Sequence, residues 1–179
     1  MSRSNPFKKK RRVANRTLLI YGEGLDDETF LKYLRWLYSF GRNVQVTVRS
    51  GTGGSAVNVV IQAFREPGDF DRKIVVLDND KESQEMIQAR QEAQRRSIEL
   101  LENTPCIEAM LLAVLKNDAS SGSKSSKWCK TEFESKHIDE KKRTELAAYL
   151  KVFPKTLLDS RRSKVKELNR LISLMLGEF

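Results

Sequence analysis

The chain has 179 residues, of which 39% are hydrophobic and 32% are charged, so it is long enough for one folded domain with an appendage but not for two sizeable domains. No apolar run approaches the roughly 20 residues that a membrane span needs. The two cysteines, Cys106 and Cys129, lack the spacing of a disulfide framework or a zinc site. We therefore expect no membrane partner and a cytoplasmic, reducing environment.

The net charge of +9 is concentrated in a basic arm at the N-terminus. Residues 1–16 contain seven basic side chains and no acid, which leaves +2 for the remainder. Five of them form a cluster: Lys8, Lys9, Lys10, Arg11 and Arg12. Such an arm typically contacts nucleic-acid phosphates in a salt-dependent way. A solvated, disordered end explains the pattern equally well.

The first predicted strand covers residues 17–21, an apolar run that ends in a Gly-Glu-Gly motif centred on Glu23. Glycines on both sides of one acid indicate a sharp turn from a strand into a helix. Asp26 or Asp27 would cap that helix, whose apolar residues recur with helical spacing as far as Tyr38. We therefore expect Glu23 at the mouth of the sheet.

The second predicted strand, residues 44–48, alternates valine with polar residues, which is typical of a strand with one exposed face. The glycine-rich loop 50–55 and a helix follow. A loop of this kind leaves backbone N–H groups free, so Gly53, Gly54 and Ser55 could hold a phosphate. A plain flexible loop is the alternative. The Lys-Ser or Lys-Thr of a P-loop is absent, so we expect no nucleotide hydrolysis here.

The central stretch is residues 74–80, in which an Ile-Val-Val-Leu run ends in Asp78, Asn79 and Asp80. This composition indicates a strand that is buried on both faces, as in a parallel sheet under helices. Ligands of such sheets collect at the carboxyl ends of the strands, and alternate strand residues point the same way. Asp78 and Asp80 would then converge on one ion. The alternative is that they are surface or helix-capping acids.

Three further elements complete the predicted α/β fold. We expect a partly exposed helix over residues 81–96 and a short strand over residues 97–101. Thr104 and Pro105 would start an apolar helix with Glu108 in its first turn, where the helix dipole favours an acid. Alternating strands and helices predict a mainly parallel sheet flanked by helices.

Residues 117–127 are rich in serine, and we expect a flexible loop there, after a catalytic domain of residues 17–116. Two helical stripes follow, over residues 146–153 and 165–175. They predict a helical C-terminal extension of residues 128–179. We expect the stripes to pack on the core, although packing on another chain, as a homo-oligomer, stays open.

Three acids, Glu23, Asp78 and Asp80, would meet at one edge of the sheet. Clustered carboxylates repel one another and raise their pKa values unless a cation neutralises them. Oxygen ligands without histidine or cysteine select Mg²⁺ or Mn²⁺ rather than zinc. Such a site can hold ions that orient a phosphodiester and activate water. We therefore predict a divalent-metal site.

Two motifs, the Glu-Gly at Glu23 after a first strand and the Asp-x-Asp of Asp78 and Asp80 after a later one, resemble those of the Toprim fold. Three further stretches are similar to the RloB-like Toprim proteins: the basic lead-in, the glycine loop and the block Asn-Thr-Pro-Cys-Ile-Glu-Ala-Met-Leu-Leu over residues 103–112. Together they cover about residues 8–116. The chain departs from the family pattern at some positions. These departures leave the acids intact, so they bear on which subfamily the chain resembles and on which substrate it takes.

The resemblance, which relates the chain to the OLD-family nucleases, implies a divalent-metal endonuclease that cuts the phosphodiester bonds of RNA, tRNA among them, or of DNA. It also implies a role in anti-phage defence beside an ABC-type ATPase. By motif position, Glu23, Asp78 and Asp80 would bind the metal and catalyse, Glu108 would be a further metal-binding acid, and Glu28 a secondary acid.

Two other functions stay open. A non-catalytic nucleic-acid-binding or effector module would bind through the basic arm. Its acids would then be vestigial or would function only with an ATPase partner. A phosphatase with Asp78 as nucleophile would leave Glu23 unexplained. Because His137 is the only histidine, we expect no Ser-His-Asp triad, and we expect Cys106 to be a buried helix residue rather than a nucleophile.

Overall fold

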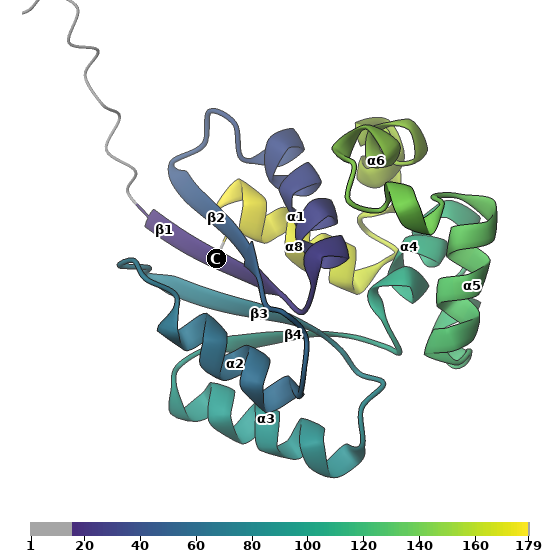
Figure 1. Cartoon of the computed structure of the whole chain (residues 1–179). Coiled ribbons are helices and arrows are strands. Elements are labelled where there is room, and N and C mark those ends of the chain that lie inside the picture. The colour runs from purple at the N-terminus through teal and green to yellow at the C-terminus, as the bar shows by residue number, and fades with distance from the viewer. Residues whose placement is uncertain (1–15, 179) are drawn as a thin grey trace, which may run out of the picture.

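The structure, a computed structural model, describes residues 16–178. The cluster of the N-terminal arm for which we predict nucleic-acid binding lies outside the described residues: Lys8, Lys9, Lys10, Arg11 and Arg12. The described range contains a sheet, helices on both of its faces and a helical extension (Figure 1).

Four parallel strands form the sheet, in the order β2-β1-β3-β4. They are β1 (Arg16–Gly22), β2 (Val44–Ser50), β3 (Arg72–Asp78) and β4 (Glu99–Asn103). The two central strands, β1 and β3, are buried at consecutive positions, as their uninterrupted apolar runs predict. The predicted α/β fold class, a parallel sheet flanked by helices, is confirmed.

Two hydrophobic layers enclose the sheet. On one face, α2 (Ala56–Arg65) and α3 (Ser83–Arg95) cover alternate residues of β1 and β3, such as Leu19 and Val75. On the other face, α1 (Leu25–Tyr38), α4 (Ile107–Lys116) and α8 (Lys166–Leu176) cover the residues between them, such as Ile20. Figure 1 shows α2 and α3 below the sheet and α1 and α8 above it. Both faces are therefore buried, and the ligand-accessible part of the sheet is its carboxyl edge.

The C-terminal extension lies beside α1 and beyond the carboxyl ends of the strands (Figure 1). It contains α5 (Ser126–Lys136), α6 (Leu146–Val152) and α7 (Lys155–Arg161), and α8 returns to the sheet. Buried Tyr149 and Phe153 pack against Phe30 of α1, and the Tyr33 hydroxyl donates to the Phe153 carbonyl at 2.5 Å. The extension is thus packed on the core, as the apolar stripes predict. No helix within residues 16–178 is long and apolar enough to cross a bilayer.

The start of α1 differs from the prediction. Its N-cap is Gly24, and Asp27 lies inside the first turn, where its carboxylate accepts the N–H groups of Glu23 (3.1 Å) and Gly24 (3.3 Å). Asp27 therefore caps α1, as predicted, but it does so from the third helical position and is not the N-cap residue, because its carboxylate satisfies free N–H groups from within the helix.

The start of α4 differs as well. The N-cap is Cys106 and not Thr104, and the Ile107 N–H donates to Asp78 Oδ1 at 2.9 Å. A carboxylate at the end of β3 therefore does what a capping side chain would do. Glu108 lies in the first turn of α4, as predicted.

Two segments around the last strand and after α4 also differ in detail. The strand expected over residues 97–101 is β4 and lies two residues further along the chain. The serine-rich stretch 117–127, expected as a flexible loop, contains the 3₁₀-helix η1 (Ala119–Ser123) and the first residues of α5. Ser121, which lies in η1, is buried.

Candidate active site

A pocket of about 830 Å³ opens at the carboxyl ends of β1, β2 and β3. Open α/β sheets bind their ligands at this edge. Six carboxylates and only three basic side chains line it, and we call it the acidic pocket: Glu23, Asp26, Asp27, Glu28, Asp78, Glu108, Arg49, Lys130 and Arg143. The structure therefore brings together four predicted acids, Glu23, Glu28, Asp78 and Glu108.

Asp78 is the last residue of β3 and lines the acidic pocket. Its Oδ1 accepts the Ile107 N–H, and its Oδ2 lies 3.8 Å from the Lys130 ammonium. Burial, together with the nearby charges of Asp27 and Glu108, raises the pKa of Asp78 to about 8, although Lys130 and the Ile107 hydrogen bond lower it. This carboxyl therefore exchanges its proton near neutral pH.

Asp27 is a further carboxylate of the acidic pocket, and its sequence position predicts only a helix cap. Burial, together with the charge of Glu108, raises its pKa to about 7 despite two backbone hydrogen bonds. The sequence does hold a signal for it, because Asp27 follows Glu23 by one helical turn.

Glu23 and Glu108 each have one paired and one unpaired oxygen. Glu23 Oε1 lies 3.0 Å from the Lys81 ammonium, and Glu108 Oε1 is bound by the Arg143 guanidinium. Their second oxygens, Glu23 Oε2 and Glu108 Oε2, are buried and have no hydrogen-bond partner among residues 16–178. An unsatisfied buried carboxylate oxygen is costly, so these two atoms are suited to a cation that the described part of the chain does not supply.

Arg143 reaches the acidic pocket from the C-terminal extension, and no motif in the sequence predicts it there. Its guanidinium lies against three carboxylates from three helices: Glu108, Glu134 at 2.9 Å and Asp26 at 3.2 Å. The residue is 6% exposed. Burial alone would lower its pKa, but the charges of Glu108 and Asp26 outweigh this and raise it. Arg143 therefore stays charged and anchors the extension to the site.

Glu28 lines the acidic pocket, but its carboxylate is already engaged. It accepts a hydrogen bond from the Ser50 hydroxyl at 2.8 Å and pairs with Lys32 at 2.8 Å. Burial raises its pKa, whereas the hydrogen bonds from Lys32 and Ser50 lower it and prevail. Glu28 thus joins the end of β2 to α1, and its predicted role as a secondary acid stays a prediction.

Asp80 does not line the acidic pocket. Its residue is exposed, and its carboxylate lies 4.0 Å from Lys81. The reason is that β3 ends at Asp78, so the alternation of side chains along a strand does not extend to Asp80. The expected convergence of Asp78 and Asp80 is not seen.

The glycine loop before α2, for which we predict phosphate binding, differs in part from that prediction. Gly53 and Gly54 adopt positive φ angles of 77° and 112°, which favour glycine, and Gly53 lines the acidic pocket. Ser55 instead caps α2 through the N–H of Asn58. The Ala56 N–H donates to the Glu85 carboxylate at 2.6 Å, so an acid of α3 stands where we expect a phosphate.

A metal ion fits the chemistry of the acidic pocket but stays a prediction. The donors are carboxylate oxygens, which suit Mg²⁺ or Mn²⁺, and two of them lack partners. In the described conformation, no group of three or more His, Cys, Asp or Glu side chains between residues 16 and 178 is arranged to hold a metal ion. If the ion binds, the residues that would hold it are Glu23, Asp27, Asp78 and Glu108.

The raised pKa values predict how the free energy of unfolding depends on pH without metal. Asp27 and Asp78 have pKa values of about 7 and about 8 in the folded state, against about 3.9 when unfolded. The folded state therefore binds more protons between these values, and its stability falls as pH rises. The lowered pKa of His137 has the opposite effect, but only near and below its usual value of about 6.5.

Urea unfolding in EDTA, followed by circular dichroism, should therefore give a free energy of unfolding that decreases from about pH 7 to about pH 8.5. Asp78→Asn should flatten this decrease, since the amide does not titrate. A rising free energy, or a slope unchanged in Asp78→Asn, would contradict the arrangement of charges described above.

Comparisons with family models, curated proteins and solved structures give no match for this chain. The Toprim and RloB-like resemblance therefore rests on the motifs alone.

Proposed function

We propose that this chain is a divalent-metal-dependent endonuclease that hydrolyses phosphodiester bonds of RNA or DNA in the acidic pocket. The observation that carries the proposal is the convergence of four carboxylates from three separate segments: Glu23 and Asp27 at the β1–α1 junction, Asp78 at the end of β3 and Glu108 at the start of α4. Two of these carboxylates have pKa values raised by burial and mutual repulsion, which means that their charged forms destabilise the fold. If they served only stability, neutral residues at these positions would give a more stable protein.

The surrounding residues suit a phosphodiester substrate. When bound, a divalent ion would supply positive charge to the phosphate and to the oxygen that leaves. Asp78, with a pKa of about 8 without metal, could accept a proton in the neutral range. Lys130 lies 3.8 Å from Asp78, is partly exposed and keeps its charge, since Glu108 and Asp78 raise its pKa more than burial lowers it. It could therefore contact the substrate phosphate.

The biological setting is part of the proposal and is supported by the resemblance. We propose an ABC-type ATPase as partner protein, a role in anti-phage defence and action in the cytoplasm. The two cysteines, Cys106 and Cys129, are both buried and free, which suits a reducing compartment. A homo-oligomer stays a prediction.

A non-catalytic module is the second candidate, and one observation favours it. Arg143 and Lys81 already pair with Glu108 and Glu23, so part of the acid group is neutralised by the chain itself. In that case the acidic pocket would bind neither Mg²⁺ nor Mn²⁺, and the chain would bind nucleic acid without cutting it.

The test is cleavage of labelled tRNA, single-stranded RNA and plasmid DNA by the purified chain, with Mg²⁺, with Mn²⁺ and with EDTA. We expect at least one substrate to be cut with metal and none with EDTA, and the substrate that is cut names the class. Calorimetric titration with Mg²⁺ runs in parallel. If no substrate is cut and Mg²⁺ does not bind, the nuclease proposal fails and the binding module remains.

A further inference from the structure

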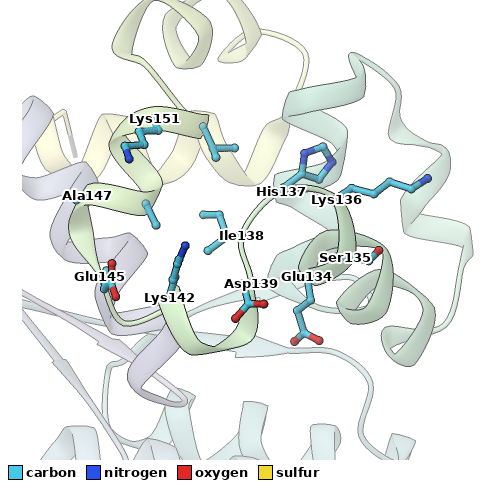
Figure 2. A pocket seen from close by; sticks show the side chains of 12 residues that line it. Glu134, Ser135, Lys136, His137, Ile138, Asp139, Lys142, Glu145, Ala147 and Lys151 are labelled. Atoms are coloured by element: carbon cyan, nitrogen blue, oxygen red, sulfur yellow. The ribbon is translucent and has the colours of Figure 1, made fainter.

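A second pocket, of about 430 Å³, lies within the C-terminal extension, between the end of α5, the segment through the 3₁₀-helix η2 (Glu140–Lys142) and α6 (Figure 2). Its volume is in the range of small-molecule sites. We call it the extension pocket, and its basic and apolar lining residues include Lys136, His137, Ile138, Lys142, Lys151 and Val152. None of these residues lines the acidic pocket.

The lysines of the extension pocket differ in how they are paired. Lys136 is bound to Glu132 at 2.9 Å. Lys142 and Lys151 form no ion pair or side-chain hydrogen bond with any residue between 16 and 178. Figure 2 shows the Lys142 ammonium between Ile138 and Ala147. Two ammonium groups at this cavity are therefore free to bind an anion.

Three carboxylates also line the extension pocket, so its formal charge is balanced. Two of them are engaged elsewhere: Glu134 holds Arg143 at 2.9 Å, and Asp139 accepts the Lys141 N–H at 3.0 Å. In Figure 2 the carboxylates of Glu134 and Asp139 point away from the centre of the cavity. The third, Glu145, forms no ion pair or side-chain hydrogen bond with a residue between 16 and 178, and in Figure 2 it lies to one side of the Lys142 ammonium. The Lys142 ammonium therefore lies among apolar side chains of the cavity, and the carboxylates lie nearer its border.

The remaining lining suits a ligand with both a charged and an apolar part. Ile138 is buried, and Val152 adds further apolar surface. His137, which packs against Phe133, has a buried Nε2 with no hydrogen-bond partner in the described part of the chain. Lysine binds phosphate as a point charge, while apolar side chains contact sugars and bases. A nucleotide combines these two chemistries.

The extension pocket is separated from the acidic pocket by one ion pair. Glu134 lines the extension pocket, and its carboxylate holds Arg143, which lines the acidic pocket and holds Glu108. Lys142 precedes Arg143 directly in the chain. A nucleic acid that is bound at the acidic pocket could therefore place an adjoining nucleotide in the extension pocket.

We propose that the extension pocket binds a nucleotide next to the scissile phosphodiester of a single-stranded substrate. Lys142 and Lys151 hold its phosphate, and Ile138 and Val152 contact its sugar or base. The substrate is single-stranded at this point, because a base must be unpaired to enter a pocket. This inference rests on the proposed function for the position of the scissile bond, but the binding that it predicts needs no metal.

The experiment measures binding of a fluorescein-labelled single-stranded RNA, and of the DNA of the same sequence, about ten nucleotides long, by fluorescence anisotropy in EDTA. Lys142→Ala/Lys151→Ala should weaken binding about tenfold and lower the slope of log Kd against log salt by about one for each lysine that contacts a phosphate. The matched control, Lys127→Ala/Lys166→Ala, removes the same charge from two exposed lysines outside both pockets and should change Kd by less than about twofold.

A second variant tests the cavity itself. Ala147→Leu replaces a methyl group that lines the extension pocket by an isobutyl group without changing the charge, and it should weaken binding several-fold. The inference is overturned if neither probe binds, if the pocket variants bind as the wild type does, or if the control pair loses as much affinity. Failure of the nuclease proposal would instead show as absent cleavage by the wild type, which leaves this binding result unaffected.

Discussion

Replacing Asp78 by asparagine is expected to reduce metal-dependent cleavage by about 10³-fold or more, with the fold retained. The amide oxygen can still accept the Ile107 N–H, so the start of α4 keeps its hydrogen bond. What is lost is one of the negative charges that would attract a cation. Because Asp27 and Glu108 repel the native carboxylate, the variant should also be more stable than the wild type at about pH 8 in EDTA.

Asp80→Asn is the matched control, since it makes the same change two residues along the chain. Asp80 is exposed, faces Lys81 and does not line the acidic pocket, so its replacement should change cleavage by less than about threefold. Both variants are assayed with Mg²⁺ for cleavage and by calorimetry for Mg²⁺ binding. An equal loss in Asp80→Asn would show that both aspartates serve the metal, as the motif alone predicts, and activity retained in Asp78→Asn would exclude Asp78 from catalysis.

The sheet can be predicted from sequence because its strands carry local signals. Residues 74–77 are an uninterrupted apolar run, residues 44–48 alternate, and glycine or an acid ends the two central strands, at Gly22 and Asp78. These signals also place Glu23 and Asp78 correctly, because the carboxyl ends of parallel strands lie at one edge. The strand Glu99–Asn103 has weaker alternation, and it is displaced by two residues from its predicted range, whereas the other three strands contain their predicted ranges and extend beyond them.

The site could be predicted only as far as such local signals reach. Asp80 has the spacing of a strand residue, but the strand ends at Asp78, and a motif does not reveal where a strand ends. Lys130 and Arg143 carry no signal at all, since a charged residue in a polar helical segment resembles a solvated one. Arg143 meets Glu108 across 35 residues of chain, and only the packing of α5 and α6 brings them together.

The C-terminal extension is therefore part of the site, although the resemblance covers only residues before it. Lys130 and Arg143 contribute two of the three basic side chains of the acidic pocket. The third, Arg49, comes from β2 and lies 3.3 Å from Glu66. The buried Glu108 has its ion-pair partner, Arg143, in the extension, so the domain and its extension are linked electrostatically.

Replacing Arg143 by methionine is expected to lower the free energy of unfolding by about 3–5 kcal/mol. Glu108 is 1% exposed, and within residues 16–178 its ion-pair partner is the Arg143 guanidinium. Without it, the carboxylate is left buried and uncompensated beside Asp27 and Asp78, both of which have raised pKa values. Urea unfolding at about pH 8 in EDTA measures the loss under conditions in which Asp27 is mostly ionised and Asp78 is about half ionised.

Two further variants separate the buried charge from the loss of contacts. Glu108→Gln combined with Arg143→Met removes both partners and should recover most of the lost stability. Arg170→Met breaks the ion pair with Glu99, which is about one-third exposed, and should cost no more than about 1 kcal/mol. If Arg143→Met costs no more than Arg170→Met, the pair with Glu108 is exposed to solvent in solution. A large difference that the double variant removes would mean that the buried carboxylate of Glu108 requires a cation, whether the guanidinium of Arg143 or a metal ion.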